Sequence, residues 1–185
     1  QQGIGLHHSQ VTLGILAGGD GSRAGGRDKG LLSDKGEPLA QRLNEAVRGD
    51  VAESSIGCRR NAPFYNAFAD RLVCDLRQGM GPVAGIRAIL AAAETDFVAF
   101  LPADTMIRPP TNWLRLLANG AEKTPNGVFA TDKGRHTACC LVRSQAIRSL
   151  DEVLTAENGS LAHFYRGAGL GSVSIEGIGR DWDSV

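Results

Sequence analysis

The chain has 185 residues and carries 20 basic and 20 acidic side chains, so its formal net charge at pH 7 is zero. This balance argues against a general attraction to nucleic acid or to an anionic membrane surface. Hydrophobic residues make up 42% of the chain, and no apolar run approaches the length that spans a bilayer. We therefore expect one globular domain over residues 11–185, preceded by a disordered N-terminus at residues 1–10.

Four cysteines lie in or beside apolar runs and show no C-x-x-C spacing. This pattern is typical of buried free thiols in a reducing compartment. The polar first ten residues also lack the apolar core of a signal peptide, so a cytoplasmic location is expected. The four cysteines are Cys58, Cys74, Cys139 and Cys140.

The first strong pattern is an apolar run at residues 11–16, which predicts a buried strand. It leads into a glycine-rich loop at residues 16–30, with the sequence LAGGDGSRAGGRDKG. The glycines let backbone N–H groups form a concave nest for anions, and the loop also carries three cations, Arg23, Arg27 and Lys29. Such a loop is suited to binding a polyphosphate.

Other interpretations of this loop have to be weighed. Residues 19–24 fit the dinucleotide fingerprint G-x-G-x-x-G/A, which requires an acidic residue at the end of the second strand. Arg59 and Arg60 stand there instead, and they favour a 2′-phosphate, so an NADP-dependent oxidoreductase stays open. The phosphate-binding P-loop is excluded because no Gly-Lys-Ser/Thr occurs. A glycine-rich surface turn with solvated charges is the purely structural alternative.

Helical and strand patterns then alternate along the chain, which predicts an α/β fold with a mostly parallel sheet. Ligands of such sheets bind beyond the carboxyl ends of the strands, so the loop, Arg59-Arg60 and Asp75 should share one edge. Helices are expected from Pro38 to about Gly49 and over residues 82–93, 111–119, 144–156 and 160–166, and strands over residues 54–58, 71–74, 97–101, 127–131, 138–142 and 171–175.

The strand predicted at residues 97–101 is a continuous apolar run, as expected of a central parallel strand. It stops at Pro102 and presents Asp104. A carboxylate at this place is suited to Mg²⁺, which prefers oxygen ligands and bridges one or two carboxylates to substrate phosphates. The alternative is that Asp104 caps a turn together with Thr105.

The glycine-rich loop resembles the signature of the molybdenum cofactor guanylyltransferases, within the nucleotidyltransferases of the sugar-nucleotide type. Gly18 favours a guanine nucleotide, because the cytidylyltransferase relatives more often have alanine there. The positions that match the signature are Leu16-Ala17-Gly18-Gly19, Arg23, Gly25 and Asp28-Lys29, with Ala24 in place of Met; Asp75, residues 81–85 and residues 102–105 continue the resemblance.

The resemblance implies a single Rossmann-like three-layer α/β domain with a mostly parallel, mixed sheet, of the nucleotide-diphospho-sugar transferase type. It implies Mg²⁺-dependent transfer of GMP from GTP to molybdopterin carrying its molybdenum, with release of pyrophosphate, and it suggests proteins that deliver the cofactor. The implied site residues are Arg23, Lys29 and Asp104 for catalysis, Leu16, Ala17, Gly18, Gly19, Lys29, Asp75 and Asp104 for the nucleotide, Arg135 and His136 for the acceptor, and Asp104 for the metal.

The sequence departs from the family pattern at two places. Gly57 stands where the family has Asn, and residues 182–185 reach the place of an Asn-x-Asn-Thr-Pro-Glu motif without containing it. Two further functions therefore stay open beside guanylyl transfer: a related cytidylyl- or sugar-phosphate nucleotidyltransferase, and a non-catalytic nucleotide-binding relative. For His136 a solvated turn position is an equally good interpretation.

Overall fold

The structure is a computed structural model that describes residues 6–17, 26–74, 81–105, 112–146, 151 and 160–179. Most of the described strands belong to one sheet. They are β1 Val11–Leu16, β4 Glu53–Cys58, β5 Arg71–Cys74, β6 Phe97–Pro102, β7 Gly127–Asp132, β8 Arg135–Arg143 and β9 Gly171–Ser174. A separate two-stranded hairpin consists of β2 Ser33–Asp34 and β3 Glu37–Pro38.

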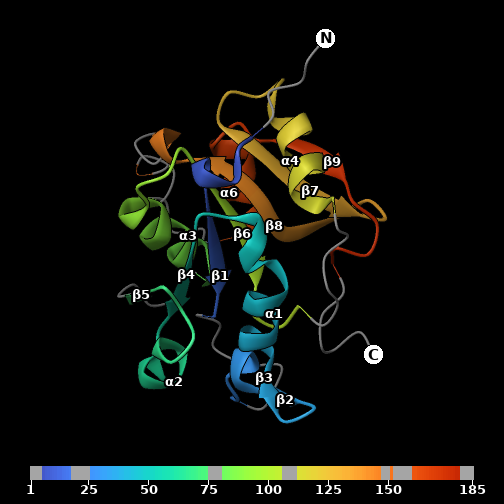
Figure 1. The fold of residues 1–185 in the computed structure, drawn as a ribbon. Coiled ribbons are helices and arrows are strands. Elements are labelled where there is room, and N and C mark those ends of the chain that lie inside the picture. Colours follow the sequence, from blue (N-terminus) through green and yellow to red (C-terminus); the bar gives the residue numbers. More distant parts are fainter. Residues whose placement is uncertain are drawn as a thin grey trace.

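The seven strands lie in the order β5-β4-β1-β6-β8-β7-β9 (Figure 1). In this described sheet β8 runs antiparallel to both of its neighbours, and the remaining pairings are parallel. The predicted α/β class with a mostly parallel, mixed sheet is therefore confirmed.

Helices cover both faces of the sheet (Figure 1). One apolar cluster joins α1 and α4 to one face, and Trp113 is 1% exposed within it, as a core residue should be. A second cluster joins α3 and α6 to the other face. The helices are α1 Leu39–Val47, α2 Ala62–Asn66, α3 Gly81–Ala92, α4 Trp113–Ala121 and α6 Leu161–Gly167, and the 3-10 turns are η1 His8–Gln10, η3 Lys29–Leu31, η4 Arg48–Asp50 and η5 Ser144–Ala146.

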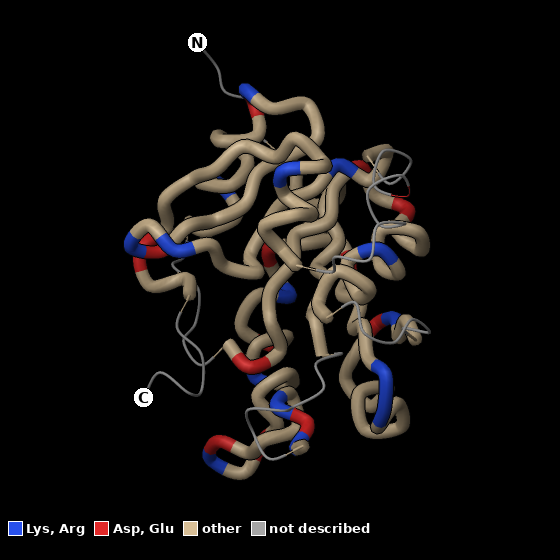
Figure 2. Tube along the Cα trace, turned by 180° about the vertical axis from the view of Figure 1, so that it is seen from behind, with Lys and Arg blue, Asp and Glu red and all other residues tan. Residues whose placement is uncertain are grey.

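The charged residues of the described chain are distributed among the elements, with both signs interspersed (Figure 2). This distribution agrees with the zero net charge of the sequence. None of the helices in the described ranges is both long and apolar enough to cross a membrane.

Several expected elements differ in detail from the structure. Pro38 does not open the first helix but ends β3, because its ψ of 140° is extended, and α1 begins at the next residue. The connection between β7 and β8 is a tight turn in which Lys133 and Gly134 both have positive φ, so β8 begins at Arg135, earlier than expected. The helix expected at residues 144–156 starts as a 3-10 turn, and most of the remainder lies outside the described residues. The expectation that all four thiols are buried is wrong for Cys74, which is exposed at the end of an edge strand.

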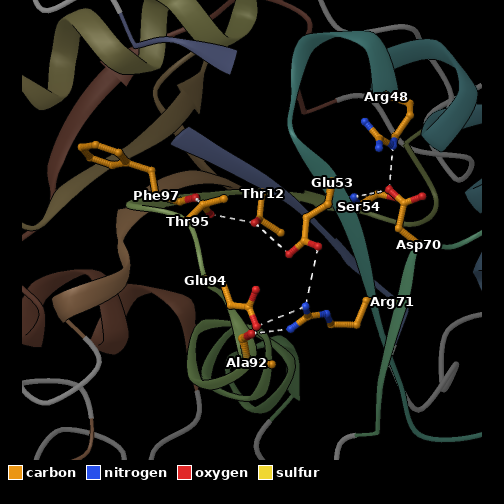
Figure 3. Close-up of polar contacts among 10 residues, drawn as sticks. All are labelled: Thr12, Arg48, Glu53, Ser54, Asp70, Arg71, Ala92, Glu94, Thr95 and Phe97. Atoms are coloured by element: carbon orange, nitrogen blue, oxygen red, sulfur yellow. Dashed lines mark hydrogen bonds and ion pairs between the residues drawn. The ribbon is translucent and has the colours of Figure 1, made fainter. Parts of the chain in front are cut away.

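Polar side chains join the amino ends of the central parallel strands (Figure 3). The Thr12 hydroxyl lies 2.7 Å from the Thr95 hydroxyl and 3.4 Å from a carboxylate oxygen of Glu53. Arg71 donates to the carbonyl of Ala92 at 2.6 Å and lies 3.8 Å from Glu53. Thr12 is fully buried, so these partners satisfy a hydroxyl that water cannot reach.

A second, separate group of polar contacts around Asp70 reaches the helical layer (Figure 3). Its carboxylate accepts from the Ser54 N–H at 2.9 Å and pairs with Arg48 Nε at 2.7 Å. Arg48 opens η4, directly after α1. The ion pair is partly exposed, so it contributes modestly to stability and mainly fixes where η4 meets β4.

The packing at Gly14 generates a stability prediction. A Cβ at Gly14 in β1 would lie 2.6 Å from a ring carbon of Phe100 in β6. Gly14→Ala should therefore overpack the core and lower the free energy of unfolding by about 1–3 kcal/mol, measured by urea denaturation. Gly49→Ala is the control, because no atom lies within 4 Å of a Cβ there. Phe100→Leu should recover part of the loss, whereas an unchanged stability of Gly14→Ala would contradict this packing.

Candidate active site

The carboxyl ends of β4, β1 and β6 lie side by side at one edge of the sheet. Leu16 is in register with Gly57 on one side and with Pro102 on the other. Beyond the strands the Ala17 N–H donates to the Gly57 carbonyl at 2.8 Å, and the Ala103 N–H donates to the Leu16 carbonyl at 2.9 Å. Three parallel strands thus end at one edge, with Leu16 and Ala17 buried in it. Asp75, which was expected to share this edge, lies outside the described residues.

Lys29 and Asp104 meet at this edge. The Lys29 Nζ lies 3.3 Å from Asp104 Oδ2, and their side chains are 25% and 14% exposed. Lys29 opens the 3-10 turn η3, and Asp104 lies in the turn that follows β6. Two residues 75 positions apart in the chain thus present opposite charges at a partly open edge, where water screens them less than on a free surface.

The turn after β6 is formed by other groups than the Asp104 carboxylate. The hydroxyl of Thr105 donates to the Pro102 carbonyl at 2.7 Å, and the Thr105 N–H donates to the same carbonyl at 3.2 Å. Thr105 therefore stabilises the turn, while the Asp104 carboxylate faces Lys29.

Asp28, which immediately precedes Lys29, is a site residue to which the sequence analysis gave no role. Its carboxylate accepts hydrogen bonds from the Tyr65 hydroxyl at 2.5 Å, the Asn61 side-chain amide at 2.9 Å and the Gly30 N–H at 3.2 Å. A signal was present in the sequence, since Asp28 belongs to the matched signature and Asn61 follows the second strand.

Arg135 and His136 begin β8, and both are exposed. The pairing of β6 with β8 ends at Phe100 and Cys140, so the first residues of β8 run on past this pair toward the carboxyl end of β6. The ring of His136 packs edge-on against Phe129, with centroids 4.8 Å apart. The structure thus brings the predicted site residues Lys29 and Asp104 into contact. The described contact of His136 is with the aromatic ring of Phe129.

Four of the predicted site residues lie outside the described residues: Gly18, Gly19, Arg23 and Asp75. Their roles stay predictions.

The described residues offer a metal ion few protein ligands. They contain no group of three or more His, Cys, Asp and Glu side chains that could hold a metal. Asp104 has a partly exposed carboxylate, whereas both oxygens of Asp28 already accept hydrogen bonds. One carboxylate with open coordination positions fits a cation that takes most of its ligands from water and a phosphate-bearing substrate.

Comparison with known proteins agrees with this geometry. A family model for the MobA-like NTP transferase domain matches residues 13–170. The chain belongs to this family. The resemblance first seen in the glycine-rich loop is therefore confirmed over most of the domain.

Individual relatives carry consistent names. The molybdenum cofactor guanylyltransferase of Pseudomonas aeruginosa (strain LESB58) is 45% identical over 112 residues, which are 60% of this chain and 56% of the relative. The chain thus matches little more than half the length of that relative. The molybdenum cofactor guanylyltransferase of Mannheimia succiniciproducens is 33% identical over 157 residues, 83% of this chain and 82% of the relative.

A solved structure supports the fold. Molybdopterin-guanine dinucleotide biosynthesis protein A from Archaeoglobus fulgidus superposes on this MobA-like domain with a TM-score of 0.70 at 18% identity, covering 89% of this chain and 83% of that one.

The thiols at the site's edge give a test of the described burial. Cys58 and Cys74 are free thiols that lie opposite each other in register at the carboxyl ends of β4 and β5. Burial raises the pKa of Cys58 to about 11. At pH 8 about one Cys58 in a thousand would then be a thiolate, so iodoacetamide should alkylate the exposed Cys74 first. Peptide mass spectrometry measures both rates, and denatured protein is the control in which the difference disappears. Equal rates in the folded protein would contradict the burial of Cys58.

Proposed function

We propose that this chain transfers GMP from GTP to molybdenum-bearing molybdopterin with the help of Mg²⁺, giving a guanine dinucleotide cofactor and pyrophosphate. The observation that carries the proposal is the Lys29–Asp104 pair, with 3.3 Å between Nζ and Oδ2, at the edge where a glycine-rich loop leaves the sheet. Membership of the MobA-like family and the names of the relatives support transfer of a guanylyl group to molybdopterin in particular.

The chemistry requires little acid–base assistance. An oxygen of the acceptor's phosphate attacks the α-phosphorus of GTP, and the bond from that phosphorus to the oxygen of the pyrophosphate leaving group breaks. The attacking phosphate is already an anion, so no strong general base is needed. Catalysis then depends on positioning and on neutralising charge.

The cations of the loop suit the leaving group. Lys29, with Arg23 in the same role, would hold the β- and γ-phosphates and stabilise the charge that develops on pyrophosphate. Arg135 and His136, both exposed at the start of β8, would contact the acceptor. The backbone of Leu16, Ala17, Gly18 and Gly19, together with Asp75, would bind the nucleoside.

Asp104 is the residue that would hold the Mg²⁺. Bound Mg²⁺ supplies charge neutralisation at the phosphoryl group under attack. Asp104 is suited to this role because its carboxylate is partly exposed and faces the loop that would bind the triphosphate, at the distance of an ion pair from Lys29. Asp28 is not a second ligand in this proposal, since three donors occupy its oxygens.

The role of Lys29 predicts a selective loss of nucleotide binding and transfer. Calorimetry with Mg²⁺ should give GTP binding in preference to CTP, ATP and NADPH, and Lys29→Ala should abolish or greatly weaken it. In a pyrophosphate-release assay with molybdopterin, the variant should lose about 10²–10³-fold in kcat, the usual effect of removing one electrostatic donor.

Lys123→Ala is the matched control, because Lys123 is an exposed lysine that follows α4. A preference for CTP would assign the chain to the cytidylyl branch, and GTP binding without pyrophosphate release would favour a non-catalytic relative. Binding of NADPH alone, or no loss in Lys29→Ala, would contradict the proposal.

The role of Asp104 predicts an effect on the metal dependence of binding. In Mg²⁺-free buffer Asp104→Asn should bind GTP as well as or better than the wild type, because a negative charge beside the triphosphate is removed. Added Mg²⁺ should strengthen GTP binding by the wild type and have little effect on the variant. Calorimetric titrations with and without Mg²⁺ measure both quantities, and an unchanged Mg²⁺ effect in Asp104→Asn would exclude Asp104 as the ligand.

A further inference from the structure

Asp28, the residue before Lys29, is fixed by several hydrogen bonds from its own chain. Asp28 Oδ1 accepts from the Tyr65 hydroxyl at 2.5 Å and from the Gly30 N–H at 3.2 Å, and Oδ2 accepts from the Asn61 amide at 2.9 Å. Both oxygens are therefore occupied by donors from this protein. A carboxylate saturated in this way is a structural anchor, because taking it up as a ligand or base would leave buried donors without a partner.

Two of the three donors come from a different part of the chain. Asn61 is the N-cap of α2, and Tyr65 lies within this helix, which follows β4. Both residues are more than 30 positions after Asp28 in the chain. Arg60, which precedes Asn61, makes a further hydrogen bond to the glycine-rich loop: its guanidinium donates to the Gly26 carbonyl at 2.7 Å. The loop after β4 thus holds the last part of the glycine-rich loop at several points.

The donors themselves are fixed in place. Tyr65 is fully buried, and burial together with its hydrogen bond to Asp28 raises the pKa of the hydroxyl far above its ordinary value, so it remains a donor at any physiological pH. Asn61 adopts a left-handed backbone conformation, with φ 60° and ψ 24°, which asparagine tolerates better than most residues. Asn61 is the N-cap of α2, and the hydroxyl of Tyr65 in this helix lies against Gly30 of the η3 turn.

The fit between Tyr65 and the turn is close. A Cβ on Gly30 would lie 2.5 Å from the Tyr65 hydroxyl oxygen and 3.0 Å from the Cβ of Ala103. Only a residue without a side chain fits between α2 and the turn that follows β6. The η3 turn is therefore packed against both neighbouring loops.

These contacts fix the position of Lys29. Asp28 is the N-cap of η3: its side chain accepts from the Gly30 N–H, and its carbonyl accepts from the Leu31 N–H at 3.1 Å. Lys29 is the first residue of this turn, and its ammonium reaches Asp104. A shift of Asp28 would therefore move the Cα of Lys29 and the direction of its side chain.

We propose that Tyr65 and Asn61, acting through Asp28, are positioning residues that hold Lys29 beside Asp104 in the geometry needed for nucleotidyl transfer. The inference deepens the proposed function, since it rests on Lys29 and Asp104 acting on the triphosphate. Neither Tyr65 nor Asn61 needs to touch the substrate. Because an error of about 1 Å in a catalytic group can cost about 10²-fold in rate, a small displacement of η3 has a large effect.

The first experiment needs no nucleotide. Tyr65→Phe keeps the buried ring and removes only the hydroxyl, and Asn61→Gly is compatible with the left-handed conformation and removes the side chain that carries the amide. Each variant should raise the rate at which an acylating reagent labels Lys29 by about two- to tenfold, the effect of losing one net hydrogen bond. Peptide mass spectrometry follows the labelling, and Lys123 in the same sample is the internal reference.

Tyr165→Phe is the matched control for this experiment. Tyr165 is also a buried tyrosine, and its hydroxyl donates to a backbone carbonyl, that of Thr137, at 2.6 Å. Its loss should leave the labelling of Lys29 as in the wild type. Asp104→Asn is the positive control, because it removes the carboxylate that pairs with Lys29.

The second experiment separates positioning from general stability. Tyr65→Phe should lower kcat/KM for GTP by about tenfold in the wild-type background and by less than about twofold in the Lys29→Ala background, because the group it positions is then absent. A purely structural role would give the same factor in both backgrounds. The same comparison with Asn61→Gly keeps the test valid if Tyr65→Phe fails to fold.

Each outcome decides the proposal. Faster labelling of Lys29 in the variants, together with non-additive kinetics, supports it. Unchanged labelling, or an equal kinetic factor in both backgrounds, overturns it. If the wild type neither binds nor transfers GTP, the proposed function fails, and the labelling rates alone decide whether Tyr65 and Asn61 position Lys29.

Discussion

The site depends on one constraint, which is the parallel pairing of β1 with β4 on one side and with β6 on the other. This double pairing sets Leu16 opposite Gly57 and Pro102, so the three loops that follow leave the sheet at one edge. The loop after β1 supplies Lys29, and the loop after β6 supplies Asp104. A slip by one residue in either pairing would reverse the face of every side chain in that strand and separate the two charges.

The secondary structure could be predicted where a long apolar pattern marks an element, and less well where a turn does. Residues 11–16 form a strand with the predicted bounds, and the strand predicted at residues 97–101 is present with Pro102 as its last residue. Of the three Asp-Lys-Gly sequences, the one at residues 28–30 begins the 3-10 turn η3, whereas those at residues 34–36 and at residues 132–134 form hairpin turns in which the Lys and the Gly have positive φ. The turn at residues 132–134 can be predicted because apolar strands flank it. The turn at residues 34–36 cannot, because β2 and β3 have only two residues each and show no alternation.

The site could be predicted in part. Residues with a local sequence signal could be predicted, whereas contacts between residues far apart in the chain could not. Lys29 and Asp104 each carry a local signal, namely a cation in a glycine-rich loop and a carboxylate after a buried strand. The contact between Asp28 and Tyr65 joins residues 37 positions apart and depends on how the loops after β1 and β4 fold over each other. A polar residue in a five-residue helix such as α2 gives no pattern that would indicate this contact.

The two carboxylates beside Lys29, those of Asp28 and Asp104, differ in whether they can take a new binding partner. Asp28 accepts three hydrogen bonds from its own chain, so releasing it would leave a buried tyrosine hydroxyl without a partner, and it stays in place. Asp104 faces Lys29, whose ammonium is equally suited to a phosphate. An incoming triphosphate with its Mg²⁺ offers both groups a new partner of opposite charge. Under the proposed function Lys29 would bind phosphate oxygens and Asp104 would hold the Mg²⁺, while Asp28, fixed by three donors, would keep the backbone of Lys29 in place.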